Sequence, residues 1–199
     1  MAVLDIDTPH GLARAHLEPD DGSAGALVLG HGAGGGVSAP DLVAVAGVAR
    51  SLDVTVALVE QPYSVAGKRS AAPAPKLDEA WVAVLEHLRA DALAGLTLVT
   101  GGRSSGARVA CRTAAAVGAA GVLCLAFPLH PPGRPDKSRL EELDAVTVPT
   151  LIVQGESDPF GMPPAAEHRQ VVRLRGNHSL RSDAAGLREA VRSWLPGVL

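Results

Sequence analysis

The segment LTLVTGGRSSGARVACRTAAAV, residues 96–117, decides how the rest of the sequence can be interpreted. It opens with the apolar run 96–100, which is typical of a buried parallel strand. Residues 107–117 have helical character. Between the two stands Gly102-Arg103-Ser104-Ser105-Gly106, which fits the pattern G-x-S-x-G. The segment therefore predicts a strand that turns sharply into a helix.

One serine of this turn has the right neighbours to stand at its tip. The residues two before and two after that serine must be small, because strand and helix nearly touch there. Gly102 and Gly106 satisfy this condition for Ser104. Ser105 does not, because Arg103 would occupy the first of its two flanking positions. We therefore predict that Ser104 is a nucleophile presented on this turn.

The remaining apolar runs predict an alternating strand and helix order. Strands are expected at residues 26–29, 54–59, 122–126 and 150–154, with a shorter, more charged one at 170–174 nearer a sheet edge. Helices are expected at residues 41–52, 77–93 and 184–195, and an antiparallel lead-in strand at 8–17. This order predicts an α/β fold with a mostly parallel sheet and helices on both faces, in a single domain over residues 1–199.

Composition excludes several classes of partner. The chain has 199 residues, of which 47% are hydrophobic and 20% charged, an ordinary globular balance. A formal charge of −3 leaves no basic footprint, and 3% aromatics leave few stacking surfaces, so no nucleic-acid partner is expected. No apolar run is long enough to span a bilayer, so no membrane partner is expected either. The composition does not predict the oligomeric state.

The N-terminus and the two cysteines indicate the cellular compartment in which the protein is expected. Residues 1–7 are acidic and lack the layout of a secretory signal. Cys111 and Cys124 lie among small apolar residues, so two buried free thiols in a reducing environment are expected rather than a disulfide. We therefore expect a cytoplasmic protein.

A serine nucleophile needs a base, and three histidines follow it in the sequence. In α/β folds that carry such a turn, the chain order is serine, then acid, then histidine. His178, in Gly176-Asn177-His178-Ser179, follows the last predicted strand and precedes the last helix, where a loop can bring its ring over the serine. His168 is expected in a solvated helix, and His130 lies at an earlier strand end. His178 is therefore the predicted base.

The orienting acid is expected just after the strand at 150–154. Asp158 falls in Gly155-Glu156-Ser157-Asp158-Pro159, at the same sheet edge as the turn around Ser104. Glu156 is the local rival, although its side chain would point elsewhere. Three other aspartates are assigned to surface or capping roles: Asp136, Asp144 and Asp183. Asp158 is therefore the predicted partner of the base.

A glycine-rich loop follows the strand at 26–29. In Gly30-His31-Gly32-Ala33-Gly34-Gly35-Gly36, a backbone N–H could stabilise an oxyanion together with the amide of the residue after the nucleophile. These two predicted oxyanion-hole donors belong to Ala33 and Ser105. No metal or organic cofactor is needed for this chemistry.

The same glycines support a rival interpretation. Gly30, Gly32 and Gly35 satisfy G-x-G-x-x-G after a strand, and Glu60 ends the next one, as in a dinucleotide-binding Rossmann fold. However, residues 37–40 intervene before any helix begins. That interpretation also assigns no role to the serine, aspartate and histidine.

Other residues at predicted strand ends are candidates for substrate contact. His130 could line a substrate pocket or shape its own loop, and Tyr63, the only tyrosine, could contact substrate or pack its loop. Lys68 and Arg69 are either simple surface charges or attract an anionic substrate.

Four motifs in this order resemble those of a known family. They are His31-Gly32-Ala33-Gly34, the segment 101–108, Phe127-Pro128-Leu129-His130-Pro131-Pro132-Gly133 and residues 154–161. Together they resemble a small lidless branch of the α/β-hydrolase superfamily, related to dienelactone hydrolases, which also includes a scaffolding subunit of the NSL histone-acetyltransferase complex. The resemblance runs from about Leu27 to Leu195. This sequence departs from the family at two positions. Ser105 stands where a bulkier residue is expected, and Asn177 precedes the histidine where an acidic residue often stands. Both departures bear on the shape of the pocket.

The resemblance implies an eight-stranded or slightly reduced sheet and an activity. Ser104, Asp158 and His178 would form the catalytic triad of a serine hydrolase that cleaves an ester or thioester of a small-molecule acyl substrate. The alternative is a binding or scaffolding protein that keeps the fold and has little activity. The resemblance does not name the substrate.

Overall fold

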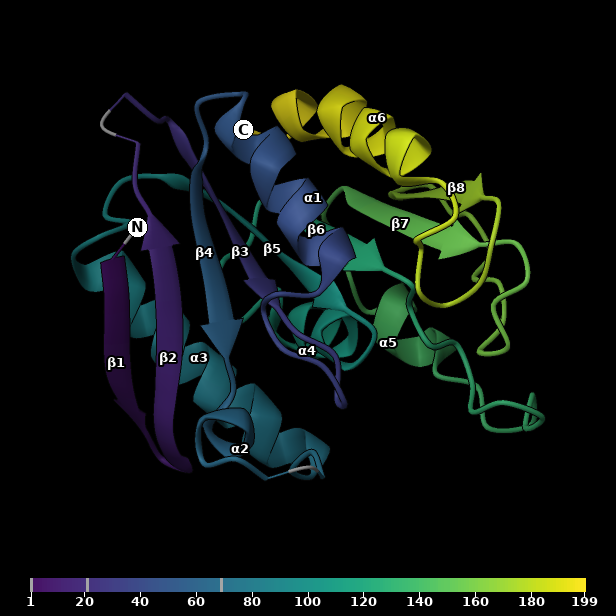
Figure 1. The fold of residues 1–199 in the computed structure, drawn as a ribbon, viewed down its shortest axis with the longest axis horizontal. Helices are drawn as coiled ribbons and strands as arrows, with labels where there is room; N and C mark the ends of the chain where they lie inside the picture. The colour runs from purple at the N-terminus through teal and green to yellow at the C-terminus, as the bar shows by residue number, and fades with distance from the viewer. Residues whose placement is uncertain (1, 21, 69) are drawn as a thin grey trace.

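The computed structural model describes residues 2–20, 22–68 and 70–199. Its centre is an eight-stranded sheet in the order β1-β2-β4-β3-β5-β6-β7-β8 (Figure 1). The strands are β1 (Ala2–Thr8), β2 (Gly11–Glu18), β3 (Gly25–Gly30), β4 (Thr55–Glu60), β5 (Thr97–Arg103), β6 (Gly121–Leu125), β7 (Thr150–Gly155) and β8 (Arg169–Leu174). The prediction of a mostly parallel sheet is confirmed.

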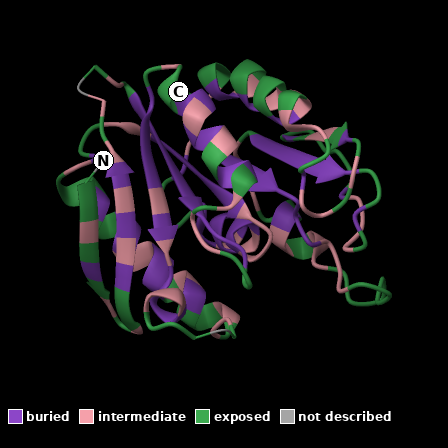
Figure 2. Cartoon of the chain, viewed as in Figure 1, coloured by how far each residue is buried: buried purple, intermediate pink, exposed green. Residues whose placement is uncertain are grey.

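The six strands from β3 to β8 are parallel, so their carboxyl ends lie at one edge of the sheet. Every residue of β3, β6 and β7 is buried (Figure 2), because helices cover both faces of these strands. This double burial explains why the strands are continuous apolar runs in the sequence. β8 lies at the edge of the sheet, as its charged sequence predicted.

Helices pack on both faces and define two apolar layers. The helices are α1 (Pro40–Arg50), α2 (Pro62–Val65), α3 (Ala74–Ala90), α4 (Ser105–Thr113), α5 (Leu140–Asp144) and α6 (Ala184–Trp194), followed by a 3₁₀ turn at Leu195–Gly197. α1 and α6 pack side by side on one face, whereas α3 and α4 cover the other (Figure 1). The α3 stripe predicted from the sequence is buried: Leu77, Trp81, Val84, Leu85 and Leu88.

The amino-terminal lead-in is a hairpin rather than one strand. β1 and β2 pair antiparallel, and Gly11, with φ of 110°, lies at their turn. The expected strand at 8–17 corresponds to β2 and begins too early. The sequence prediction missed β1, because only Ile6 of this edge strand is buried and the apolar pattern is correspondingly weak.

The structure differs from the sequence prediction at three further places. α2 and α5 were not expected, since each is too short to show an apolar period. The helix expected around His168 is wrong: His168 lies in an exposed turn before β8. Arg169 starts that strand and its buried guanidinium pairs with Asp144 at 3.0 Å, which holds the chain extended there.

Cys111 of α4 and Cys124 of β6 are both buried and free, with their Sγ atoms 3.5 Å apart, which confirms the expectation of free thiols. The contact with Cys111, together with complete burial, raises the pKa of Cys124 well above its ordinary value. Among the described residues, no helix is long and apolar enough to cross a membrane.

Candidate active site

Ser104 stands on a strained turn at the carboxyl end of β5. Its φ is 52° and its ψ is −108°, and α4 begins at the next residue. The backbone N–H of Ser104 donates to the Leu125 carbonyl of β6 at 2.9 Å, which anchors the turn to the neighbouring strand. An L-residue with positive φ is uncommon and is found where surrounding structure imposes it, often at functional sites.

The glycines around the turn allow backbones to meet. A Cβ atom at Gly102 would lie 2.5 Å from the Gly30 carbonyl oxygen and 2.8 Å from the Gly106 carbonyl carbon. A Cβ atom at Gly106 would also lie 2.5 Å from that same oxygen of Gly30. β3, β5 and α4 therefore converge where a side chain of any size is excluded.

Gly106→Ala is therefore expected to lower the free energy of unfolding by about 3 kcal/mol, because the new methyl group can be accommodated only by moving backbone. Urea denaturation would measure the loss. Gly35→Ala is the matched control, since a Cβ atom there would meet nothing within 4 Å. Equal stability of the two variants would contradict the packing argument.

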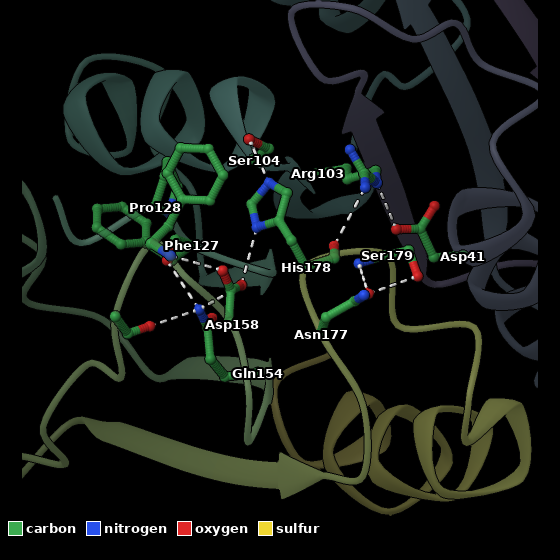
Figure 3. A network of polar contacts seen from close by, with 12 residues as sticks. Asp41, Arg103, Ser104, Phe127, Pro128, Gln154, Asp158, Asn177, His178 and Ser179 are labelled. Carbon is green, nitrogen blue, oxygen red and sulfur yellow. Dashed lines mark hydrogen bonds and ion pairs between the residues drawn. The ribbon is translucent and has the colours of Figure 1, made fainter. Parts of the chain in front are cut away.

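Ser104, His178 and Asp158 form one hydrogen-bonded chain (Figure 3). His178 Nε2 lies 3.0 Å from Ser104 Oγ, and His178 Nδ1 lies 2.8 Å from Asp158 Oδ2. A carboxylate can only accept, so Nδ1 carries the proton and donates to Asp158. Nε2 then has a free lone pair that accepts the serine hydroxyl. The structure thus brings together the three residues singled out in the sequence.

Asp158 is held on both carboxylate oxygens. Its side chain is 1% exposed. Gln154 Nε2 donates to Oδ2 at 2.9 Å, and the Phe160 backbone N–H donates to Oδ1 at 2.9 Å. The rival Glu156 is exposed. These bonds fix the carboxylate in the direction that meets the imidazole.

The loop that carries His178 is bound to the loop that carries Asp158. The Ser157 N–H donates to the Gly176 carbonyl at 2.9 Å, and a Cβ atom at Gly155 would lie 2.4 Å from the Asn177 carbonyl oxygen. The Phe160 ring also packs on the imidazole, with centroids 4.3 Å apart. The acid and the imidazole are therefore fixed by the same pair of loops.

Arg103, directly before the serine, joins the His178 loop to α1. Its Nε donates to Asp41 Oδ2 at 2.7 Å, and its Nη2 donates to the His178 carbonyl oxygen at 3.1 Å (Figure 3). The Asp41 side chain is 2% exposed. Sequence analysis assigned no role to Arg103 or Asp41.

The loop after β3 is pinned beside the serine by two aromatic rings. Buried His31 accepts the Gln61 N–H on Nε2 at 3.2 Å, so its Nδ1 is the donor to the Gly32 carbonyl at 2.8 Å. Tyr63 Oη donates to the Ala33 carbonyl at 3.3 Å. A Cβ atom at Gly32 would lie 3.6 Å from Ser104 Cβ, so this loop packs against the serine.

Burial raises the pKa of Tyr63 above its ordinary value of 10.0. The neutral phenol is the form that the fold favours, so its stabilising contribution is present below pH 10.0 and is lost as the pH rises through the higher folded pKa. Because Tyr63 is the only tyrosine, tyrosinate absorbance reports this one group. We expect a titration shifted to higher pH than in urea-unfolded protein; coincident curves would contradict it.

The two residues considered for substrate contact lie in different places. Tyr63 borders an open cavity of about 640 Å³ that Lys68 also lines, whereas Arg69 lies outside the described residues. His130 packs against the Asp158 loop: its N–H donates to the Phe160 carbonyl at 3.0 Å, and a Cβ atom at Gly161 would lie 2.5 Å from its Nε2. The contacts of His130 favour the loop-shaping alternative.

The glycine loop lacks the geometry of a dinucleotide site. In a Rossmann fingerprint the helix opens at the third glycine, but α1 begins only at Pro40, five residues after Gly35. Within residues 2–20, 22–68 and 70–199, no group of three or more His, Cys, Asp or Glu side chains is arranged to hold a metal ion.

Comparison with known proteins agrees with this architecture. A solved structure of a lidless α/β serine hydrolase from Xanthomonas campestris is 25% identical, with a TM-score of 0.74 over 98% of this chain and 95% of that chain. A dienelactone hydrolase from Anabaena variabilis is 18% identical, with a TM-score of 0.79 over 100% and 97%. Est1E from Butyrivibrio proteoclasticus is 17% identical, with a TM-score of 0.77 over 99% of this chain and 98% of that chain. A family model described as an alpha/beta hydrolase domain matches residues 23–186, and the chain therefore belongs to the α/β-hydrolase family.

Proposed function

We propose that this α/β hydrolase is a serine hydrolase that cleaves an ester or thioester through a covalent acyl-enzyme. The observation that carries the proposal is the continuous hydrogen-bond chain from Ser104 Oγ through His178 to Asp158. Family membership supports hydrolase activity. The proposal treats residues 1–199 as one catalytic domain acting on a small-molecule acyl substrate.

In the first half-reaction, Ser104 Oγ attacks the acyl carbonyl while His178 Nε2 takes the hydroxyl proton. Asp158 stabilises the imidazolium that forms. The proton then passes to the leaving alcohol or thiol as its bond to carbon breaks. Water repeats the sequence on the acyl-enzyme, with His178 again acting first as base and then as acid, which releases the carboxylic acid and the free serine.

The tetrahedral intermediate carries negative charge on oxygen, which we propose is stabilised by the backbone N–H groups of Ala33 and Ser105. Each such donor contributes about 3 kcal/mol to transition-state stabilisation in well-studied enzymes. Ser105 is the first residue of α4, so its N–H has no acceptor within the helix. The bonds from His31 and Tyr63 hold the Ala33 loop beside Ser104. We further propose that Tyr63 borders the substrate, whereas His130 shapes the loop next to Asp158.

A fluorophosphonate probe tests the proposal directly, because it phosphonylates only an activated serine. We expect labelling of the folded protein and none of Ser104→Ala. A panel of nitrophenyl esters and acyl thioesters of increasing chain length would then identify the preferred acyl group. Folded protein that neither reacts with the probe nor turns over any member of the panel would refute the proposal and favour a binding or scaffolding role.

A further inference from the structure

Arg103 connects the strand that carries the nucleophile with the loop that carries the base. It is the last residue of β5 and immediately precedes Ser104. Its Nη2 donates to the backbone carbonyl of His178 at 3.1 Å. Because Arg103 and Ser104 are neighbours in the chain, this bond ties the backbone of the histidine to the backbone of the serine.

Asp41 holds the guanidinium from the other side. Its side chain is only 2% exposed, and its Oδ2 accepts from Arg103 Nε at 2.7 Å. Its Oδ1 accepts the Leu42 N–H at 3.0 Å in the first turn of α1. A buried carboxylate requires such partners, so Asp41 and Arg103 fix each other. The planar guanidinium can then present Nη2 in one defined direction.

The guanidinium also packs against the glycine loop. A Cβ atom at Gly32 would lie 3.0 Å from Arg103 Nη1, so the loop backbone closes one side of the guanidinium. The Arg103 side chain is 21% exposed and is bounded by α1, the glycine loop and the His178 loop. It therefore has little freedom to leave the His178 carbonyl.

We propose that Arg103, held by Asp41, is a positioning residue that sets the place of His178 relative to Ser104. This inference rests on the proposed function, because it acts through the contact of 3.0 Å between His178 Nε2 and Ser104 Oγ. Asp158 orients the imidazole ring, whereas Arg103 fixes the backbone from which that ring extends. Neither charge of the Asp41–Arg103 pair touches the reacting atoms.

Loss of this anchor has a specific kinetic consequence. A displacement of about 1 Å between reacting groups can cost roughly 100-fold in rate. We therefore expect Arg103→Met to lower kcat by at least about tenfold while KM stays within about twofold, because the acyl pocket is left in place. Arg103→Lys should recover only part of the loss, since one ammonium cannot span both acceptors.

The control is Arg112, in the last turn of α4. Arg112 donates to both oxygens of Asp78 at 2.7 and 2.8 Å and to Glu142 Oε2 at 3.2 Å, and its side chain is 19% exposed. Arg112→Met removes a comparable pair away from the serine and should leave kcat unchanged. The double variant Asp41→Asn/Arg103→Met removes both charges, so that no unpaired carboxylate stays buried, and should lose as much kcat as Arg103→Met.

A measurement independent of turnover separates this inference from the proposed function. The ¹⁵N resonance of His178 Nε2 reports whether this nitrogen accepts the Ser104 hydroxyl, so it should shift in the double variant and keep its wild-type position in Arg112→Met. Wild-type kcat together with an unshifted resonance in the double variant would overturn the positioning role. If the wild type shows no turnover or labelling, the proposed function fails, and the resonance alone still decides whether Arg103 positions His178.

Discussion

Ser104→Ala is expected to lower kcat/KM by about 10⁶-fold, the loss seen when the nucleophile of a serine hydrolase is removed. The substitution removes only the hydroxyl group. Any rate that the variant keeps above that of the uncatalysed reaction in water would come from the oxyanion donors and substrate binding. Stability should change little, because alanine keeps the side chain small at φ of 52° without relieving the turn. Steady-state kinetics on the best ester of the panel, with circular dichroism to verify the fold, would measure both.

Ser193→Ala is the matched control for this substitution, since Ser193 is exposed on α6 and its hydroxyl donates to Glu189, one helical turn earlier. It should retain wild-type kcat/KM. A Ser104→Ala variant with more than a few per cent of wild-type activity would show that another residue is the nucleophile.

Asp158→Asn is expected to lower kcat/KM by about 10⁴-fold, because an amide selects the wrong imidazole tautomer. Asp158 Oδ2 accepts from both His178 Nδ1 and Gln154 Nε2, while Oδ1 accepts the Phe160 N–H. Either orientation of an asparagine amide therefore turns its NH₂ group toward another donor. Two donors that face each other without an acceptor should also lower the free energy of unfolding by about 1–3 kcal/mol.

Glu156→Gln is the control, because Glu156 lies in the same loop and is exposed. Kinetics and urea denaturation of both variants, measured side by side, test the assignment. If Glu156→Gln lost activity and Asp158→Asn did not, the acid would have been assigned to the wrong carboxylate.

The parallel core of the fold was predictable because its strands are buried on both sides. β3, β6 and β7 are uninterrupted apolar runs, and such runs are visible without any knowledge of their neighbours. β1 was missed because only one of its residues is buried. The error at His168 has a tertiary cause: Arg169 is drawn into the sheet by Asp144, which lies 25 residues earlier.

The candidate site likewise has residues that the local sequence indicates and residues that only tertiary contacts bring together. Ser104, Asp158 and His178 were predictable because chain order and strand ends constrain them in this fold. Arg103 and Asp41 were not, since they are 62 residues apart and nothing local shows that α1 brings the carboxylate to β5. Gln154 is the first residue of the motif at 154–161, but its bond to Asp158 depends on how the loop after β7 folds back.

The bonds between the Asp158 and His178 loops have a consequence for how the site opens. The Ser157 N–H donates to the Gly176 carbonyl, and the Glu156 N–H donates to the Leu174 carbonyl. These loops form one cooperative unit, so local unfolding should carry the acid and the base away from Ser104 together. The amide hydrogens of Glu156 and Ser157 should then exchange with solvent at similar rates. Local opening would therefore break the contact between Ser104 and His178 and keep the bond between His178 and Asp158.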